Sequence, residues 1–392
     1  MITRGINVYR GLTKSKVVRF RHPINFKFSF NYGPRIDCTG PAAAGSAKVV
    51  FKDKNSGSEA YSGETNPGLF TTLFRKWYTP WIVEAYQDGE KIYEFDFEKS
   101  LYGSKVCISI DSSSLGDTLA WVPVAESFRQ KYKCDLYLTS FWSELLCQFY
   151  PDIRFQVPGY REPGTHATFG LGWYEETDRN THPRDPRTIS LQQVAGDILG
   201  ISLDGDVNFK NIPATISKSK PAIEGKYVCF AMDSTANAKH WHLLNGWQRL
   251  ADELAKKGYK VAVIQKQQTN LQGVLDKTGD HDILERAIDV YHSSFVVGIG
   301  SGLSWLGWAL GKPVVMISGF SDPKCEFATK NYRVINKNVC NGCFNDPSHK
   351  FDRGDWDWCP RLKETERRFE CTKSISVEMV LEHIELLEKE QL

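Results

Sequence analysis

An aspartate occupies a turn where a parallel α/β sheet would place a reactive group. Residues 105–129 begin with an apolar strand pattern, pass through small polar residues and continue as a helix pattern. Asp117 lies at that turn, and ligands of such sheets gather at the carboxyl ends of the strands. A carboxylate there can act as a general base, or it can only stabilise the helix N-terminus. The helix dipole predicts a lowered pKa for Asp117, and Asp111 at the end of the strand is the alternative base.

A second polar turn follows the predicted strand 227–232. It carries Ser234, Thr235 and Lys239 before an amphipathic helix pattern that includes Leu244. Hydroxyls and free N–H groups at a helix N-terminus form an anion site, and a lysine adds the point charge that suits a diphosphate. The turn therefore predicts phosphate binding, with a capped helix and a surface lysine as the alternative.

A third turn is rich in glycine. Residues 294–318 have the pattern of a strand, a glycine turn, a helix and another strand. Ser301, Gly302 and Ser304 lie where the backbone could approach a phosphate at a helix N-terminus. A nicotinamide-binding fingerprint is the competing interpretation, but the glycine spacing is G-x-G-x-G rather than G-x-G-x-x-G. We therefore favour a phosphate contact at this turn.

Four of the ten cysteines are grouped near the C-terminus. Cys340 and Cys343 are separated by two residues, fifteen residues precede Cys359, and eleven more precede Cys371. Four thiolates predict a closed, structural S4 site, for which zinc is the default metal and a single iron the second choice. Unmetallated surface thiols are the alternative. The other six cysteines are scattered singly and are expected to be buried.

The pattern of elements predicts three regions. Alternating aromatic and polar residues and a hairpin turn at Asp88 predict a β-rich, barrel-like domain over 1–103. Two α/β domains are expected over 104–220 and 221–392, the second including the cysteine segment 338–373.

A long segment, 159–187, has little apolar periodicity. Loops of that length inside compact domains are often functional, although a solvated loop is the alternative. Its candidates for contact with a charged ligand are His166, Arg179, His182 and Arg184.

Charge and hydropathy exclude several kinds of partner. The formal net charge is +2, which gives no electrostatic case for binding nucleic acid or a membrane surface. No apolar run reaches the length that spans a bilayer, and residues 1–20 lack the apolar core of a signal peptide. We expect a cytoplasmic protein without membrane insertion.

The string SSLGDTL at 113–119 resembles the SS-x-GD-x-L signature of the ADP-heptose glycosyltransferases, which build the inner core of lipopolysaccharide. In that family the acid is the proposed catalytic base, so the resemblance gives that role to Asp117. It also implies contact with the nucleotide sugar for Leu115, Gly116 and Thr118.

Two further segments resemble the same family, with departures. The turn at 234–239 is similar to its diphosphate-binding pattern of paired hydroxyls followed by Lys-x-Trp. The small residues at 301–304 match its D-T/S-G-x-x-H segment, but Gly300 replaces the acid and Trp305 the histidine. Amides and a lysine at 265–268 replace an acidic ribose contact. The resemblance therefore implies phosphate contacts and leaves the ribose contacts unassigned.

Taken over its whole length, the chain resembles the bacterial autotransporter heptosyltransferases, because the cysteine finger is absent from the ordinary lipopolysaccharide enzymes. The resemblance implies a GT-B glycosyltransferase with two Rossmann-like domains that transfers heptose, with inversion, from ADP-glycero-manno-heptose to serine hydroxyls of an autotransporter adhesin passenger domain. It also implies structural iron on the four cysteines, with zinc as the alternative, and a homo-oligomer, a dodecamer. Trp356 and Trp358 of the finger would suit a contact surface. The alternative functions are a lipopolysaccharide-core heptosyltransferase and a non-catalytic scaffold or sugar-binding protein.

Overall fold

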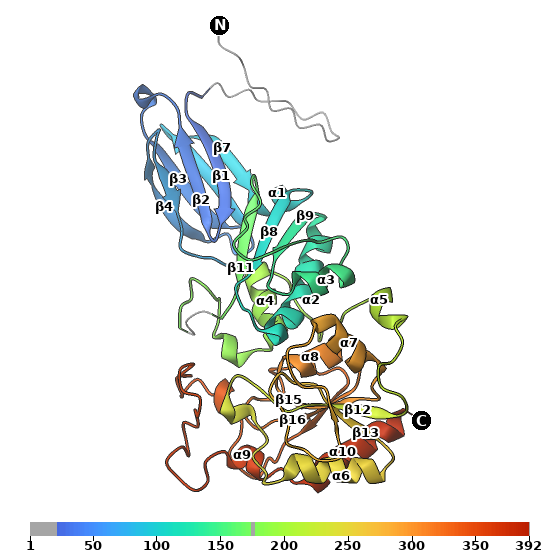
Figure 1. Cartoon of the computed structure of the whole chain (residues 1–392). Coiled ribbons are helices and arrows are strands. Elements are labelled where there is room, and N and C mark those ends of the chain that lie inside the picture. The colour runs from blue at the N-terminus through green and yellow to red at the C-terminus, as the bar shows by residue number, and fades with distance from the viewer. Residues whose placement is uncertain (1–21, 174–176, 392) are drawn as a thin grey trace. The chain divides into compact units, whose positions relative to one another are not determined.

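The computed structural model describes residues 22–173 and 177–391, which divide into two compact units (Figure 1). Of the described residues, the first unit holds 22–28, 36–71 and 81–96, and the second holds 29–35, 72–80 and everything from 97 onward. The stretch 1–20, considered above for a signal peptide, lies outside the described residues.

The first unit contains a four-stranded antiparallel sheet in the order β4-β3-β6-β7. Phe51 and Trp81, both fully buried, meet edge to face with ring centroids 6.0 Å apart. The predicted hairpin is present, because Asp88 and Gly89 adopt the positive φ angles that a tight turn between β6 and β7 requires. The elements of the N-terminal region are β1 (Asn25–Asn31), β2 (Pro34–Thr39), η1 (Ala42–Ala44), β3 (Ala47–Asp53), β4 (Glu59–Thr65), β5 (Phe70–Thr72), β6 (Trp81–Gln87) and β7 (Glu90–Asp96).

The second unit begins with a parallel sheet. Its strands run in the order β10-β9-β8-β11, and Phe30 and Asn31 of β1 pair in parallel with the outer side of β11. Of these four strands, β8 comes first along the chain and lies beside β11, which comes last. The chain therefore passes from β8 to β9 and β10 in one direction and returns to the other side of β8 at β11, as in a doubly wound sheet. The elements here are α1 (Phe97–Leu101), β8 (Lys105–Ile110), α2 (Leu115–Tyr132), β9 (Asp135–Thr139), α3 (Ser143–Phe149), β10 (Arg154–Gln156), β11 (Ala167–Leu171), η2 (Pro186–Thr188), α4 (Leu191–Leu199) and α5 (Ala214–Ser217).

Strand β11 corrects one prediction. The segment 159–187 was expected to form a loop, yet residues 167–171 form a strand that is buried throughout. A strand inside a parallel sheet is covered on both faces and shows no alternation of polar and apolar residues. The short sequence ATFGL therefore carries little periodic signal, although it lies between β8 and β1.

A second parallel sheet has the strand order β14-β13-β12-β15-β16-β17. This is the doubly wound order in which ligands bind where the winding reverses, here between β12 and β15. Its elements are β12 (Tyr227–Ala231), η3 (Asn237–Lys239), α6 (Gly246–Lys256), β13 (Lys260–Val263), β14 (Leu275–Asp276), α7 (Ile283–His292), β15 (Val296–Ile299), α8 (Gly302–Ala309), β16 (Val314–Ile317), β17 (Asn331–Val334), η4 (Cys343–Asn345), α9 (Glu370–Lys373) and α10 (Val377–Glu390).

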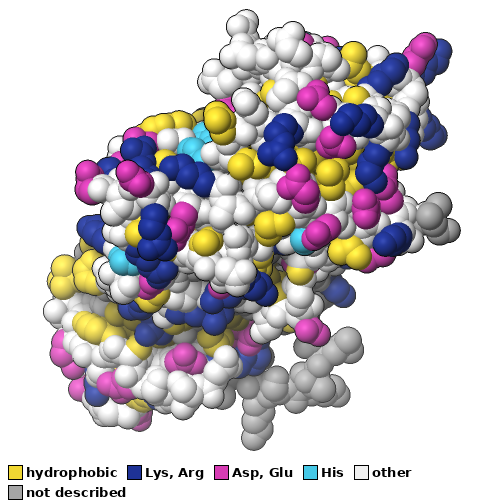
Figure 2. Space-filling view, turned by 90° about the horizontal axis from the view of Figure 1, so that it is seen from below, with side chains coloured by type: hydrophobic (Ala, Val, Ile, Leu, Met, Phe, Trp, Pro, Cys, Tyr) yellow, Lys and Arg dark blue, Asp and Glu magenta, His cyan; other side chains and the backbone are white. Residues whose placement is uncertain are grey.

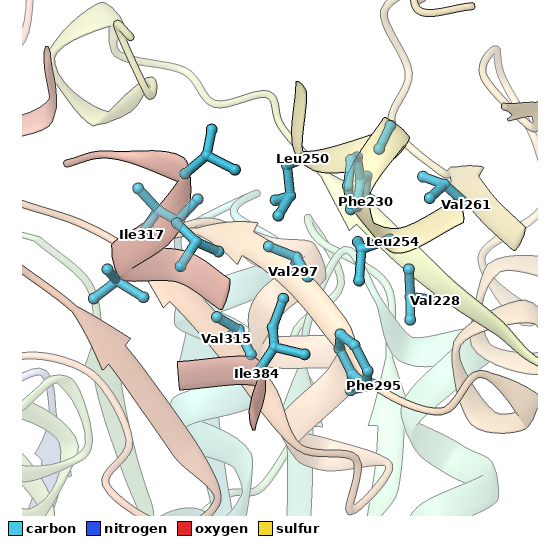
Figure 3. Close-up of a cluster of buried hydrophobic side chains, with 14 of the residues drawn as sticks. Val228, Phe230, Leu250, Leu254, Val261, Phe295, Val297, Val315, Ile317 and Ile384 are labelled. Carbon is cyan, nitrogen blue, oxygen red and sulfur yellow. The ribbon is translucent and has the colours of Figure 1, made fainter. Parts of the chain in front are cut away.

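Neighbouring side chains of β15 point to opposite faces of this sheet. Val297 lies in the buried cluster of Figure 3 with Leu254 of α6 and Ile384 of α10. Val296 points to the other face, where its Cγ2 lies 2.9 Å from the position of a Cβ added at Gly307 of α8. Helices α6 and α10 therefore cover one face and α8 the other (Figure 1). Each fully buried aliphatic side chain stabilises this packing by about 1.5–3 kcal/mol.

The face of the molecule seen in Figure 2 is mixed in character. In the view of Figure 2, basic and acidic side chains are interspersed and hydrophobic side chains are scattered among them. Within the two described ranges, no helix combines the length and the hydropathy needed to cross a membrane.

Candidate active site

The carboxyl ends of strands from both parallel sheets face one cavity of about 950 Å³, a volume that accommodates a small-molecule ligand. The lining residues follow β8, β11, β12, β13, β15 and β16, as expected for the switch points of doubly wound sheets. Those used below are Ser112, Ser114, Leu115, Gly116, Asp117, Trp173, Asp233, Ser234, Thr235, Lys239, Gln265, Lys266, Gln267, Gly300, Ser301, Gly302, Trp305, Ser321, Glu326, Phe344 and Trp356.

Two glycines let the N-termini of α2 and α8 approach each other at the cavity wall. A Cβ at Gly302 would lie 3.0 Å from Cβ of Leu115, and one at Gly116 would lie 3.1 Å from Cδ1 of Trp305. Both contacts are tighter than ordinary van der Waals separations, so larger residues would push the helices apart. Trp305, which stands where the family has a histidine, is buried and packs this contact. The two helix N-termini therefore present their N–H groups to the same space.

Asp117 lies at the first turn of α2 with its carboxylate inside the cavity. Its Oδ2 accepts hydrogen bonds from Ser112 Oγ at 2.7 Å and from Trp173 Nε1 at 2.9 Å. Its backbone N–H donates to Ser114 Oγ, the helix cap. Desolvation raises the pKa of Asp117 above its ordinary value, although these bonds and the charge of Lys239 act in the opposite direction. The predicted lowering of the pKa is therefore wrong, because desolvation outweighs the helix N-terminus and the hydrogen bonds.

The alternative base, Asp111, lies elsewhere. It is exposed, accepts a hydrogen bond from Ser109 Oγ at 2.8 Å and does not line the cavity.

Ser234, Thr235 and Lys239 all line the cavity, but they do not begin a long helix as predicted. They lie in a loop that ends in the single turn η3, and α6 starts later, at Gly246. Asn245 has a positive φ of 54° and turns the chain just before α6. Leu244, which the sequence pattern places on the apolar face of the helix, therefore precedes the helix and is 84% exposed.

The loop after β12 is held by an acid and a histidine. Asp233 Oδ1 accepts the backbone N–H of Ser234 at 2.9 Å and lies 3.1 Å from His240 Nε2. These contacts fix the backbone on both sides of Thr235 and Lys239. The lysine ammonium is therefore positioned by a loop with its own hydrogen bonds rather than by a helix.

The residues of the glycine turn at 300–304 have different roles. Ser301 Oγ is buried without a hydrogen-bond partner among the described residues, and Ser301 and Gly302 line the cavity. Ser304 is fully buried and its hydroxyl donates to Ile299 O at 2.7 Å. Thr118 on α2 behaves in the same way, donating to Ser114 O at 3.0 Å. Ser304 and Thr118 therefore direct their hydroxyls to backbone carbonyls and do not line the cavity.

A carboxylate does lie beside Gly300, although the family's acid is missing from that position. Glu326 Oε1 is 3.0 Å from the position that a Cβ at Gly300 would take. Ser321 Oγ donates to Glu326 at 2.6 Å, and Arg333 forms an ion pair with it. Sequence reasoning missed Glu326 because it lies 26 positions further along the chain and reaches this place only through the fold.

The long segment contributes a residue that was not predicted. None of its four candidates lines the cavity. His166 bonds to Ser100, Arg184 pairs with Asp197, and the Arg179 carbonyl accepts from Trp77; His182 is buried. The segment reaches the cavity through Trp173, two residues after β11. A correct prediction of that strand would have placed Trp173 beside the turn that follows β8.

The four C-terminal cysteines line a separate cavity of about 20 Å³, enough for one atom-sized guest. Cys340 and Cys343 have their sulfurs 3.7 Å apart. Burial and neighbouring thiols raise the pKa of Cys343 and of Cys371 to about 12, so a cation is what would stabilise thiolates there. As the side chains stand, no three His, Cys, Asp or Glu within 22–173 and 177–391 are arranged to hold a metal. The donor chemistry and the cavity fit a metal, but the arrangement is not a formed site.

Of the other predictions for cysteines and tryptophans, some are confirmed and others are wrong. Five of the six scattered cysteines are buried as expected, whereas Cys147 is exposed. Trp356 is 52% exposed and borders the large cavity, but Trp358 is buried in the finger core and offers no contact surface.

Comparison with known proteins agrees with this arrangement. A model of glycosyltransferase family 9 (heptosyltransferase) matches residues 200–355. The chain is 36% identical over 369 residues to the autotransporter heptosyltransferase BAHTCr of Citrobacter rodentium, covering 90% of this chain and 87% of that protein. It is also 31% identical over 372 residues to the inactive autotransporter heptosyltransferase BimC of Burkholderia thailandensis, covering 90% and 84%.

The similarity extends to solved structures. The dodecameric iron-containing heptosyltransferase TibC of enterotoxigenic E. coli, solved with ADP-D-beta-D-heptose, aligns with a TM-score of 0.84 at 32% identity, over 97% of this chain and all of that one. Identity above 30% across nine tenths of the sequence shows that this chain belongs to the autotransporter heptosyltransferases, a group of glycosyltransferases.

Proposed function

We propose that the protein transfers heptose from ADP-glycero-manno-heptose to serine hydroxyls of an autotransporter adhesin, with inversion at the anomeric carbon. One observation carries the proposal. A single cavity contains the half-buried carboxylate of Asp117 together with Lys239 and the hydroxyl of Ser301, which has no hydrogen-bond partner among the described residues. A base and an anion site facing one space are what transfer from a nucleoside diphosphate sugar requires.

The proposed architecture is GT-B. The β-rich region would end at 103, the acceptor-side Rossmann-like domain would cover 104–220, and the nucleotide-sugar domain would cover 221–392 with the finger at 338–373. The two doubly wound sheets and the cavity at their strand ends support this division.

Donor binding would use both helix N-termini and the loop after β12. Ser234, Thr235 and Lys239, with the hydroxyl of Ser301 and the backbone N–H of Gly302, are proposed to hold the diphosphate. A positive point charge and hydrogen-bond donors match its charge. Leu115 and Gly116, which lie beside Gly302, would contact the sugar. Gln265, Lys266 and Gln267, after the end of β13, line the same cavity, and their contact with the nucleoside stays unassigned.

In the proposed step, Asp117 accepts the proton of the incoming serine hydroxyl. The serine oxygen bonds to the anomeric carbon from the face opposite the leaving group, and the bond from that carbon to the diphosphate oxygen breaks, releasing ADP. Because desolvation raises the pKa of Asp117, the carboxylate is a stronger base than an ordinary aspartate. Lys239 and the helix N-termini would stabilise the negative charge that develops on the diphosphate.

The finger is proposed to bind one structural iron through Cys340, Cys343, Cys359 and Cys371, with zinc as the alternative. The metal would supply a tetrahedral cross-link between distant segments rather than any step of the reaction. The four cysteines converge on one small cavity, which supports the assignment. By analogy with TibC, we also propose a homo-oligomer, a dodecamer, acting in the bacterial cytoplasm on the passenger domain before secretion.

A second candidate function is a non-catalytic sugar-binding or scaffold role. It is favoured by BimC, a relative of 31% identity that is named as inactive. The presence of Asp117 with three bonded neighbours in a cavity of about 950 Å³ supports the catalytic function instead.

Mass spectrometry separates these functions. The purified protein would be incubated with ADP-heptose and an autotransporter passenger domain, beside an Asp117→Asn control and beside a lipopolysaccharide-core acceptor. A heptose increment on serines of the passenger domain, absent with Asp117→Asn, is expected. Transfer to the core acceptor alone would contradict the proposed substrate, and no transfer to either acceptor would favour the scaffold.

A further inference from the structure

Trp173 touches the proposed base, and the topology explains why. Strand β11 pairs with β8 along its length, so the residue two positions after β11 comes beside the turn that follows β8. There the indole Nε1 of Trp173 donates to Oδ2 of Asp117 at 2.9 Å. The same oxygen accepts from Ser112 at 2.7 Å. Two donors therefore hold one oxygen of the carboxylate of Asp117, a residue that lines the cavity.

The indole is itself held from the cysteine finger. Its ring packs edge to face against Phe344, with centroids 6.0 Å apart at 79°. Phe344 directly follows Cys343 in η4. The backbone carbonyl of Trp173 accepts from Arg353 Nη1, also in the finger, at 3.2 Å. On its other side the ring meets Trp121 of α2 at 6.3 Å. The finger therefore touches the base through one intervening side chain.

We propose that Trp173 is a positioning residue that orients Asp117, and that Phe344 of the cysteine finger holds Trp173 in that position. The inference rests on the proposed function, in which Asp117 accepts the proton. It gives the finger a role in the reaction's geometry besides its structural cross-link. A finger that loses its fold would then leave the cavity present but the carboxylate poorly oriented.

The electrostatic consequence has a definite sign. The groups facing the carboxylate are Ser112 and Ser114 from the turn, Lys239 from η3 and Trp173 from the segment after β11. A hydrogen bond to the ionised form stabilises that form and lowers the pKa. Removing the indole donor therefore raises the pKa of Asp117 further, and proton acceptance then requires a higher pH.

The variant Trp173→Phe removes the donor and keeps an aromatic ring against Phe344. The matched control is Trp241→Phe, which removes a buried indole donor that bonds to Ile375 O at 2.9 Å and that lies in the core cluster with α6 and α10 rather than at the cavity. In heptosyl transfer from ADP-heptose, Trp173→Phe should move the acidic limb of the pH profile of kcat/KM to higher pH. On that limb the rate should fall about three- to tenfold, the effect of one lost hydrogen bond. Trp241→Phe should leave the limb in place. Equal profiles for the two variants would overturn the proposal.

A second readout needs no activity. Because the pKa of Asp117 is raised in the fold, the free energy of unfolding falls as pH rises through that pKa. Trp173→Phe should extend this fall to higher pH, and the difference should vanish when Asp117→Asn is also present. If the difference persists with Asp117→Asn, the indole does not act on Asp117. If the wild-type protein turns over no ADP-heptose, the proposed function fails while this readout still decides the contact.

The link to the finger is tested by a double-variant cycle. Phe344→Leu keeps an apolar side chain next to Cys343 but removes the ring that packs on Trp173. It should shift the pH profile in the same direction as Trp173→Phe, and it should add nothing when Trp173→Phe is already present. Additive shifts would show that Phe344 does not act through Trp173. Metal content measured beside each variant separates this from a loss of the finger.

Discussion

The ion pair between Arg333 and Glu326, a residue of the cavity wall, makes a large and calculable contribution to the free energy of unfolding. Glu326 and Arg333 have side chains only 9% and 8% exposed, and their contact is charge-assisted. Arg333 also donates to Ser318 Oγ at 3.0 Å and to Ser321 O at 2.7 Å. Glu326→Gln keeps the shape of the side chain but leaves the guanidinium without its counter-charge. Removing one partner of a buried pair costs about 3–5 kcal/mol.

We expect the lower end of that range, about 3 kcal/mol, because Ser318 and Ser321 still accept from the guanidinium. The assay is urea unfolding followed by circular dichroism and by tryptophan fluorescence. The matched control is Glu253→Gln, which breaks an exposed pair whose side chains are 42% and 70% exposed. Such a pair contributes about 0–1 kcal/mol.

Two results test whether Glu326 and Arg333 form a buried pair in which each charge depends on the other. Replacing both partners, by Glu326→Leu with Arg333→Met, should cost less than Glu326→Gln alone, because no unpaired charge remains buried. A loss below about 1 kcal/mol for Glu326→Gln, equal to that of the exposed control, would refute the account of a buried and mutually dependent pair.

Three other changes have expected outcomes. Lys239→Met keeps the aliphatic stem but removes the charge, so calorimetry should show ADP binding weakened about ten- to a hundredfold. Cys343→Ser should abolish bound metal, measured by elemental analysis, and lower the melting temperature, whereas Cys147→Ser at an exposed position outside the finger should change neither. Asp117→Asn should raise the free energy of unfolding at neutral pH and flatten its pH dependence. Its raised pKa means that ionised Asp117 opposes folding: its stabilising contribution is complete below the unfolded pKa and is lost as pH rises through the folded pKa. A neutral-pH loss of stability would contradict the desolvated environment.

The turn around Asp117 could be predicted because strand, turn and helix are contiguous in sequence. The same holds for the glycine turn after β15, where Ser301 and Gly302 line the cavity as expected. Local patterns fix which residues follow a strand, and the sheet topology then brings those residues to one edge. The four cysteines line one small cavity, but within the described ranges their side chains do not form the S4 site that their spacing predicts.

Trp173 and Glu326 could not be found in this way. Trp173 depends on β11, a strand buried on both faces that lacks an alternating pattern. Glu326 reaches the side of Gly300 only through tertiary packing. The prediction of a long helix that follows the Ser234–Lys239 turn was wrong because Asn245 adopts a left-handed conformation and α6 begins only after it. The amphipathic pattern of the sequence does not show such a break. The pKa of Asp117 was misjudged because a local sequence shows the helix N-terminus but not the desolvation.

The central claim, that Asp117 is the base of heptosyl transfer, is tested most directly by single-turnover kinetics. Wild-type protein and Asp117→Asn would be mixed with ADP-heptose and a passenger domain, with ADP affinity measured separately. Asp117→Asn should slow transfer about 10²–10⁴-fold while ADP binds with unchanged affinity. Transfer by Asp117→Asn at the wild-type rate, with ADP bound equally well, would contradict it.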